Sequence, residues 1–168
     1  MGLLPSKYTL AIELFRVAES KYNQGRFHPQ NPEKYKGNPE NIIYRSSWEL
    51  KFMKWCDRNS QIIEWGSEEF FIPYYDPTTK KVRKYYPDAY VKIKNNDDVI
   101  KKYIIEIKPY RQTQPPEPGK KKKKTLITEA VTYEKNRAKW RAAEEWCKDR
   151  MLEFMIITER ELGLINKK

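Results

Sequence analysis

The sequence predicts a single domain of the α/β class, in which a mixed central sheet is flanked by helices. A chain of 168 residues suits one domain with a substantial core. Segments with the period-2 alternation of strands follow a segment of helical periodicity, and a second long helical segment precedes a last apolar strand. The predicted order is α-β-β-β-α-β, with a helical extension at the N-terminus.

The N-terminal extension is predicted to be a helix followed by a structured loop. The helix runs from about Ser6 to Asn23, with Ser6 as its N-cap and Gly25 after its end. Its apolar face consists of Leu10, Leu14, Val17 and Ala18. Residues 26–40 contain three prolines and one glycine, so we expect an irregular segment that Phe27 and Tyr35 hold against the surface.

A second helix is predicted from Ser46 to about Arg58, and Glu49 in its first turn has two interpretations. Ser46 and Glu49 fit a capping box, in which the glutamate folds back onto the Ser46 amide. Glu49 also lies on the apolar stripe of this helix, which contains Phe52, Met53 and Cys56. A carboxylate on a buried face can instead serve a functional site, so both interpretations stay open.

Three strand segments follow this helix and lead to a central hairpin. Strands are predicted at 61–65, 69–75 and 80–86, with a turn at 76–79. The hairpin itself lies between Tyr85 and Tyr110.

The central hairpin is the best defined part of the predicted sheet. Its first strand, Ala89–Ile93, alternates with period 2, and Asn95–Asp98 supply a polar turn. Its second strand runs from about Val99 to Lys108 and is apolar on both faces, as in a central strand.

Two acidic residues occupy positions in this hairpin where a strand gains nothing from them. Asp88 precedes the first strand, and Glu106 lies inside the second, on the same face as Lys108. A buried carboxylate is costly unless it is paired or binds a metal. The alternative is a surface hairpin with an exposed salt bridge, because a chain rich in Lys and Glu can match so short a pattern by chance.

The C-terminal part is predicted to contain a long helix, a buried strand at 152–158 and a short turn or helix at 159–164. The helix runs from Thr125, its predicted N-cap, to about Met151. One face of it carries Asn136, Trp140, Ala143 and Cys147. Asn136 is polar on an otherwise apolar face, so it either borders a functional site or is a satisfied amide at the edge of the core.

The charge of the chain indicates a polyanionic partner. The formal net charge is +11, a balance that favours nucleic acid. Residues 109–124 form a Pro-rich segment that ends in five lysines, which we expect to be mobile and to contact phosphates rather than only solvent. The candidate DNA contacts are Arg45, Arg83, Lys120, Lys121, Lys122, Lys123, Lys124, Lys135 and Lys139.

Composition also excludes several classes of protein. A chain with 39% hydrophobic and 14% aromatic residues is not disordered throughout. Cys56 and Cys147 both fall on apolar helical stripes, which predicts buried thiols rather than a disulfide framework, and one histidine argues against zinc catalysis. No segment resembles a signal peptide or is long enough to span a bilayer, so we expect a cytoplasmic protein without membrane contact or nucleotide cofactor.

Several motifs resemble known nucleases. Asp88, Glu106 and Lys108 together match the pattern of the PD-(D/E)xK superfamily, which has the restriction-endonuclease-like fold. The segments YRSSWE, IIEWGSEEFFIPYY, RKYYPDAYV and YIIEIKPY resemble the TnsA-type transposon endonucleases. With the block HPQNPEKYKG they resemble more closely the head-completion nucleases of large tailed phages, over roughly residues 26–163.

The resemblance implies a magnesium-dependent DNA endonuclease, with Mn²⁺ as a substitute for Mg²⁺. Asp88 and Glu106 would be direct metal ligands, and the Ile107 carbonyl a further one. Glu49 would bind a second ion or a water molecule held by it, and Lys108 would hold the attacking water. The catalytic set implied is therefore Glu49, Asp88, Glu106 and Lys108.

The same resemblance implies an action on packaged DNA ends during virion assembly. Double-stranded DNA would be the substrate, phage head or portal proteins are candidate partners, and the host cytoplasm and the virion are the candidate locations. We expect one nuclease domain over residues 1–168, with the extension in 1–40 and the core in 41–165. Two alternatives stay open: a TnsA-like strand-cleaving subunit of a transposase, and a non-catalytic nuclease-fold protein that binds DNA or plugs a portal.

Overall fold

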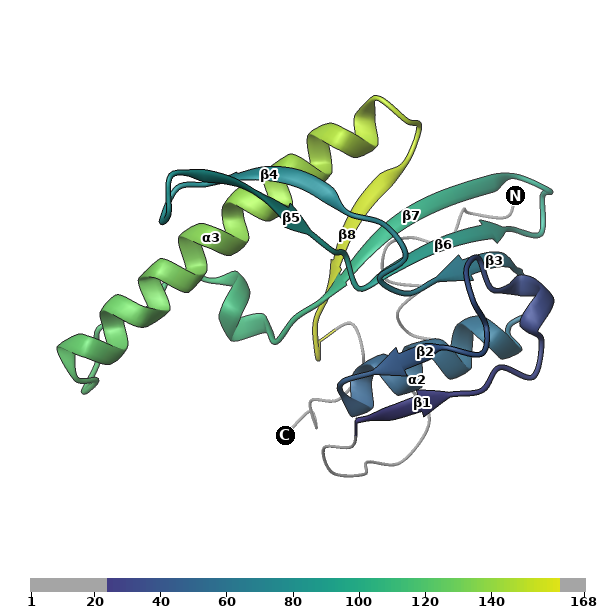
Figure 1. The fold of residues 1–168 in the computed structure, drawn as a ribbon, viewed down its shortest axis with the longest axis horizontal. Coiled ribbons are helices and arrows are strands. Elements are labelled where there is room, and N and C mark those ends of the chain that lie inside the picture. The colour runs from purple at the N-terminus through teal and green to yellow at the C-terminus, as the bar shows by residue number, and fades with distance from the viewer. Residues whose placement is uncertain (1–23, 161–168) are drawn as a thin grey trace.

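The centre of the protein is a four-stranded mixed sheet with the order β3-β6-β7-β8 (Figure 1). The computed structural model describes residues 24–160, so the helix predicted from Ser6 to Asn23 and most of the turn predicted at 159–164 lie outside the described residues. The strands are β3 (Ile62–Gly66), β6 (Ala89–Lys94), β7 (Ile100–Ile107) and β8 (Glu153–Ile157). The first three pair antiparallel and β7 pairs parallel with β8, which confirms the predicted mixed α/β sheet.

One layer against this sheet is built from helix α2 (Ser47–Arg58) and a small N-terminal sheet. That sheet pairs β1 (Gly25–Phe27) with β2 (Ile42–Tyr44), and a short helix η1 (Pro32–Lys34) lies between them in sequence. The predicted apolar stripe of α2 is buried in the main core together with Trp65 and Ile105. Trp65 is fully buried and meets the rings of Phe27 and Tyr35 edge to face, with centroids 5.9 and 4.8 Å away.

A second layer is built from helix α3 (Lys123–Lys148) and the hairpin of β4 (Ile72–Asp76) and β5 (Lys81–Tyr85). A smaller core joins them through Ile72, Tyr74, Tyr85 and Ala143. The predicted inward face of α3 is confirmed, because Asn136, Trp140, Ala143 and Cys147 are all buried. Figure 1 shows the hairpin lying along α3, whose N-terminal half projects away from the central sheet.

Several predicted boundaries were wrong. Residues 26–40 are not wholly irregular, because Gly25–Phe27 pairs with β2 and a 3-10 turn follows. The strand predicted at 80–86 does not lead into the central sheet but forms a separate hairpin with β4. Helix α3 begins at Lys123, so Thr125 lies in its first turn, and its N-cap is Lys122 without a side-chain cap. Lysine is a good helix former, which lets the helix extend back into the lysine run.

The remaining connection η2 (Tyr110–Thr113) lies in the segment between β7 and α3. Both cysteines are free and buried, as predicted. Among the described helices, none combines the length and apolarity that a membrane span requires.

The loop between β1 and β2 is anchored by a buried carboxylate of α2. Asp57, near the end of α2, is 1% exposed, and its two oxygens accept hydrogen bonds from the backbone N–H groups of Gln30 (2.8 Å) and Asn31 (2.9 Å). The Asn31 side chain and the Lys34 ammonium in turn donate to the Asp57 carbonyl, at 2.9 and 3.1 Å. This loop is therefore a structured one that is tied to the end of α2.

Replacing Asp57 should destabilise the protein. In Asp57→Ala, two backbone donors lose a charged acceptor in a part-buried place, so we expect a loss of about 1–3 kcal/mol in the free energy of unfolding. Urea denaturation measures this difference. The exposed Asp97 gives a matched control, since Asp97→Ala should stay within about 0.5 kcal/mol of the parent. Equal stability of the two variants would contradict the anchoring role.

Candidate active site

The register of β6 and β7 brings the two predicted carboxylates together. Ala89 pairs with Ile105, so Asp88, one residue earlier, lies opposite Glu106, one residue later. Side chains directly opposite each other in an antiparallel pair project to the same face, with Cβ atoms about 4.5–5.5 Å apart. The Asp88 carboxylate also accepts a hydrogen bond from the Ile107 N–H at 2.7 Å, which holds it against the end of β7.

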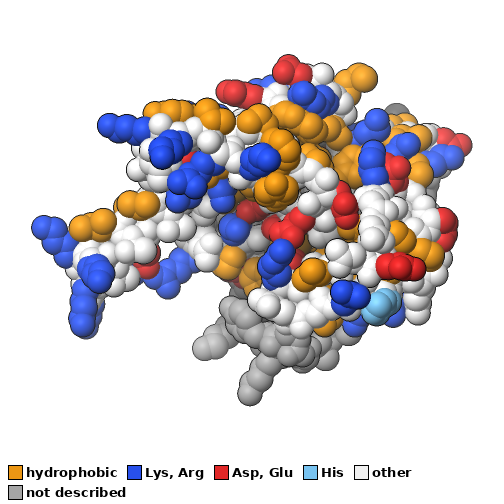
Figure 2. All heavy atoms as spheres, in the orientation of Figure 1, with side chains coloured by type: hydrophobic (Ala, Val, Ile, Leu, Met, Phe, Trp, Pro, Cys, Tyr) orange, Lys and Arg blue, Asp and Glu red, His pale blue; other side chains and the backbone are white. Residues whose placement is uncertain are grey.

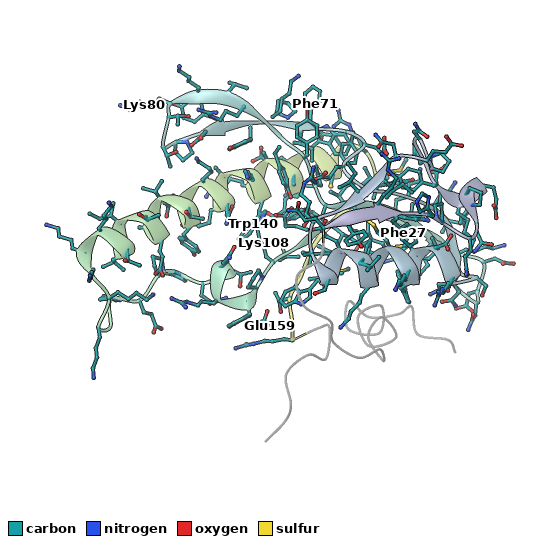
Figure 3. All side chains as sticks on the ribbon, turned by 60° about the horizontal axis from the view of Figure 1, so that its bottom comes forward. Phe27, Phe71, Lys80, Lys108, Trp140 and Glu159 are labelled. Carbon is teal, nitrogen blue, oxygen red and sulfur yellow. The ribbon has the colours of Figure 1, made fainter. Side chains whose placement is uncertain are left out.

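Glu106 is held by two side chains. It is 3% exposed, its Oε1 lies 2.9 Å from the Lys108 ammonium, and its Oε2 accepts a hydrogen bond of 2.7 Å from the Tyr85 hydroxyl. Lys108 was predicted here, and it lies between α3 and the layer that contains α2 (Figure 3). Tyr85 was missed, because the pair Tyr85-Tyr86 does not reveal which ring turns inward. Its position in β5, on the same face as the charged Arg83, gave no signal of burial.

The carboxylates repel each other electrostatically. Withdrawal from solvent and the charge of Glu106 raise the pKa of Asp88 well above its usual value, and the charge of Glu49 adds to this. The hydrogen bond from Ile107 and the charge of Lys108 oppose the rise without cancelling it. Two carboxylates in such proximity form a place where a cation is favoured.

Lys108 remains a cation in this setting. Burial alone would lower the pKa of its ammonium, but the charge and hydrogen bond of Glu106 and the charges of Asp88 and Glu49 outweigh burial and raise that pKa. A lysine that stays protonated cannot accept a proton from water. Its chemical capacity here is to donate hydrogen bonds and to neutralise negative charge.

Glu49 caps its own helix and also lies near the carboxylate pair. Its N–H donates to the Ser46 hydroxyl oxygen at 3.1 Å, and its carboxylate accepts from that hydroxyl (3.0 Å) and from the Arg45 N–H (2.8 Å). The cap by Ser46 is therefore confirmed, but the Glu49 carboxylate folds back onto the Arg45 N–H and not onto the predicted Ser46 amide. Because its charge also acts on the pKa values of Asp88 and Lys108, the end of α2 points toward the site, and a functional role stays a prediction.

The arrangement fits a magnesium ion that the substrate helps to bind. In residues 24–160, no three His, Cys, Asp or Glu side chains form a group that could hold a metal. Asp88 and Glu106 nevertheless supply two carboxylates, and magnesium is commonly held by one or two carboxylates plus waters and substrate phosphates. Each carboxylate oxygen has a second lone pair beyond the hydrogen bond that it accepts, so Lys108 and Tyr85 leave room for a ligand role. A direct role of the Ile107 carbonyl stays a prediction.

Three of the predicted DNA contacts converge between α3 and the β4–β5 hairpin. Arg83 and Lys135 lie 3.3 and 3.6 Å from the same oxygen of Asp76. The Lys139 ammonium lies above the rings of Tyr74 (5.9 Å) and Tyr85 (5.6 Å). Asp76 was missed because it was assigned to a turn. The alternation of Ile72, Tyr74 and Asp76 was a signal that could have placed its side chain on the buried face.

The other basic candidates are distributed differently. Arg45 forms an ion pair with Glu68 close to the carboxylate pair. Lys121 is paired with Glu129 of α3 at 2.6 Å, Lys122 is the N-cap of α3, and Lys123 and Lys124 lie in its first turn. The run therefore occupies the end of α3 that projects from the sheet, and the structure does not bring it to Asp88 and Glu106 (Figure 1). The mobility predicted for residues 109–124 stays a prediction.

Two further features border this region. A cavity of about 740 Å³ lies between the segment after β7 and the first half of α3, lined among others by Tyr110, Lys120 and Tyr133, and it contains none of the candidate catalytic residues. Asn136 is 6% exposed on the inward face of α3. Its predicted place at the border of the site stays a prediction.

The face of the molecule seen in Figure 2 has acidic side chains at its centre, with Lys and Arg side chains around them.

Comparisons with known proteins give a consistent result. The family model for the N-terminal part of TnsA-like endonucleases matches residues 59–159, a stretch that contains Asp88, Glu106 and Lys108. The chain is 39% identical over 148 residues to a head completion nuclease of Enterobacteria phage T4, which covers 86% of this chain and 96% of that protein. No solved structure matches the chain significantly.

Because the pKa of Asp88 is raised, replacing its carboxylate with a neutral side chain should stabilise the folded protein by an amount that depends on pH. A folded state that keeps a proton which the unfolded state has lost becomes less stable as pH rises, here above the usual Asp pKa of about 4. Asp88→Asn removes this cost but keeps an acceptor for the Ile107 N–H. Without divalent metal, the variant should therefore unfold at a higher temperature than the parent at pH 7–8 and match it near pH 4.

Thermal unfolding in a chelator between pH 4 and pH 9 measures this difference. Asp97→Asn, which changes an exposed carboxylate, should follow the parent at every pH. An Asp88→Asn variant no more stable than the parent at any pH would show that the like-charge pair imposes no cost.

Proposed function

This chain belongs to the family of TnsA-like endonucleases and is related to a head completion nuclease of Enterobacteria phage T4, and on that premise we propose that it is a divalent-metal-dependent DNA endonuclease of phage head completion. The observation that carries the proposal is the convergence of Asp88, Glu106 and Lys108 at one end of the central hairpin. Such a group has the parts that phosphodiester hydrolysis needs: acidic ligands for a cation and a fixed positive charge. The extent of the T4 match, 96% of that protein, favours head completion over a transposase subunit.

In the proposed mechanism, Asp88 and Glu106 would hold the metal, with the Ile107 carbonyl beside them. When bound, a divalent ion neutralises charge that develops on the phosphate and lowers the pKa of nearby water. Lys108 stays protonated and donates hydrogen bonds, which positions the attacking water and stabilises developing negative charge. The Tyr85 hydroxyl fixes the orientation of the Glu106 carboxylate. Hydrolysis then forms a bond from the water oxygen to phosphorus and breaks the bond to the leaving strand oxygen, while the attacking water gives up a proton to solvent and the leaving oxygen takes one up from solvent.

Charge supports DNA as the substrate. The net charge of +11 favours a polyanion, and the first turn of α3 contains no acidic residue. Backbone N–H groups at a helix N-terminus and the lysines beside them both favour a phosphate there. DNA would therefore be held at the lysine run as well as at the carboxylate pair, with contacts to phosphates that do not depend on base sequence.

Cleavage of plasmid DNA tests the enzymatic proposal. The parent should cut in Mg²⁺ or Mn²⁺ and not in chelator. Asp88→Asn and Glu106→Gln should lose about 10²-fold or more in rate, because each removes an anionic group from the centre of the reaction. Mg²⁺ should also raise the unfolding temperature of the parent but not that of Asp88→Asn, a readout of binding that needs no activity.

The control variant Asp97→Asn should cut at the parent rate. Cleavage by Asp88→Asn at the parent rate in Mg²⁺ would overturn the assignment of the site. The assembly role is tested by placing the same Asp88→Asn change in the phage genome that encodes the chain. DNA-filled heads that fail to become infectious particles are expected, and normal infectivity would contradict the role in head completion.

Glu49 can be assigned by a pair of substitutions. Glu49→Gln keeps acceptors and donors for the capping contacts with Ser46 and Arg45 but removes the charge, so it should unfold near the parent temperature. If the charge serves catalysis, as we propose, this variant cuts DNA much more slowly than the parent. If Glu49 only caps α2, Glu49→Gln keeps full activity, and only Glu49→Ala loses about 1 kcal/mol of stability.

A further inference from the structure

We propose that α3 and the β4–β5 hairpin form a phosphate-binding site beside Glu106, in addition to the one proposed at the lysine run. In this site Lys139 contacts the scissile phosphate of bound DNA. Asp76 is a positioning residue, which holds Arg83 and Lys135 for the neighbouring phosphate of the same strand. The inference rests on the proposed nuclease function and adds to it the groups that orient the DNA strand over the carboxylates.

Asp76 organises the outer part of this site. Its side chain is fully buried at the end of β4, and one oxygen, Oδ1, accepts hydrogen bonds from the Thr78 N–H (2.9 Å) and hydroxyl (2.6 Å). The other oxygen, Oδ2, has no hydrogen bond within the described residues and faces Arg83 and Lys135. Burial alone would raise the pKa of Asp76, but the hydrogen bonds and Lys135 outweigh it and lower that pKa to about 2. The carboxylate therefore lies within ion-pair distance of two cations and can orient both.

Lys139 forms the inner part of the site. It lies one helical turn from Lys135, on the side of α3 that faces the hairpin, and its ammonium stands over the ring of Tyr85. The hydroxyl of the same tyrosine binds Glu106, so this ring separates the ammonium from the catalytic carboxylate. Within the described residues, Lys139 has no carboxylate partner at ion-pair distance. It is therefore a half-buried cation without a counter-charge of its own.

The charge balance of this cluster indicates an anionic ligand. Arg83 and Lys135 share one carboxylate, Asp76, and Lys139 has none at ion-pair distance within the described residues, so the cluster carries an excess of positive charge. Burial lowers the pKa of Lys139; the charge of Glu106 opposes this, while those of Lys108 and Lys135 add to it. A bound phosphate would supply the missing counter-charge to all three. A purely structural network would instead be expected to balance its charges, because uncompensated charge away from water is costly.

The position of the cluster identifies which anion fits. The Arg83 and Lys135 side chains keep 50% and 35% of their surface exposed, so their charged ends can reach a ligand in solvent. Lys139, further in, acts electrostatically on both Glu106 and Lys108, the residues at the proposed centre of cleavage. A row of cations that leads from solvent to the catalytic carboxylate matches successive phosphates of one DNA strand. The lysine run lies at the N-terminal end of α3, before Lys135 in the same helix.

Two variants test the two roles. Lys139→Met keeps the apolar stem of the side chain and removes its charge, while Lys148→Met, at the exposed end of the same helix, is the matched control. Single-turnover cleavage at saturating DNA should fall about 10²-fold in Lys139→Met and not in the control. In chelator, the slope of log affinity against log salt should flatten by about 0.9. Lys139→Arg should restore that slope.

Asp76→Asn separates positioning from simple charge. The substitution makes the protein more positive, so a general electrostatic effect would tighten DNA binding. If Asp76 positions Arg83 and Lys135, the variant instead binds DNA more weakly, with a flatter salt slope. Tighter binding, or a lower unfolding temperature with an unchanged salt slope, would show that Asp76 is not a positioning residue.

The outcomes distinguish this inference from the proposed function. If the parent cuts DNA and Lys139→Met cuts at the same rate, the second phosphate site is wrong while the nuclease assignment stands. If the parent cuts no DNA in any divalent metal, the proposed function fails. The inference about the cation cluster would then be overturned only if the salt slopes of Lys139→Met and Asp76→Asn also equal that of the parent.

Discussion

The antiparallel register of β6 and β7 is the constraint on which the rest of the site depends. It places Asp88 opposite Glu106 on one face of the central sheet, and a slip of one residue would send Glu106 to the opposite face. The two carboxylates repel each other, and this repulsion is one cause of the raised pKa of Asp88. The surrounding contacts from Ile107, Lys108 and Tyr85 are the ones that hold two like charges in place.

The two layers that flank the sheet supply these contacts from different directions. The start of helix α2 faces the site, and Glu49 lies there in the helix cap. At the other end of the helix, Asp57 binds the loop between β1 and β2 and so fixes that end. The layer of α3 and the β4–β5 hairpin contributes Tyr85 directly, and Lys139 through its place above the Tyr85 ring. The site is therefore a junction of three structural layers, and packing in both cores determines its geometry.

The basic residues of the protein surround a pair of carboxylates, an arrangement that suits a polyanion bound over an acidic site. The protein carries a net charge of +11, yet its most conspicuous group is a pair of adjacent carboxylates. A phosphate backbone would be repelled from such a pair unless cations stood between them. Lys108, fixed by Glu106, and the cluster around Asp76 stand at the positions where that repulsion would be strongest.

The sequence by itself determined the central hairpin, because strand periodicity acts over a few residues and fixes which face each side chain takes. It also identified Ser46 as the cap of α2 and the buried stripes of both helices, for the same reason. The family and the carboxylate pair were recognised in the sequence through the resemblance of its motifs to known nucleases. Only the tertiary structure decided that Tyr85 binds Glu106, that Asp76 gathers Arg83 and Lys135, and that the lysine run lies away from the carboxylates. Those contacts join the β4–β5 hairpin to α3 and β7, segments far apart in the chain, and no local pattern encodes how two separately folded elements pack against each other.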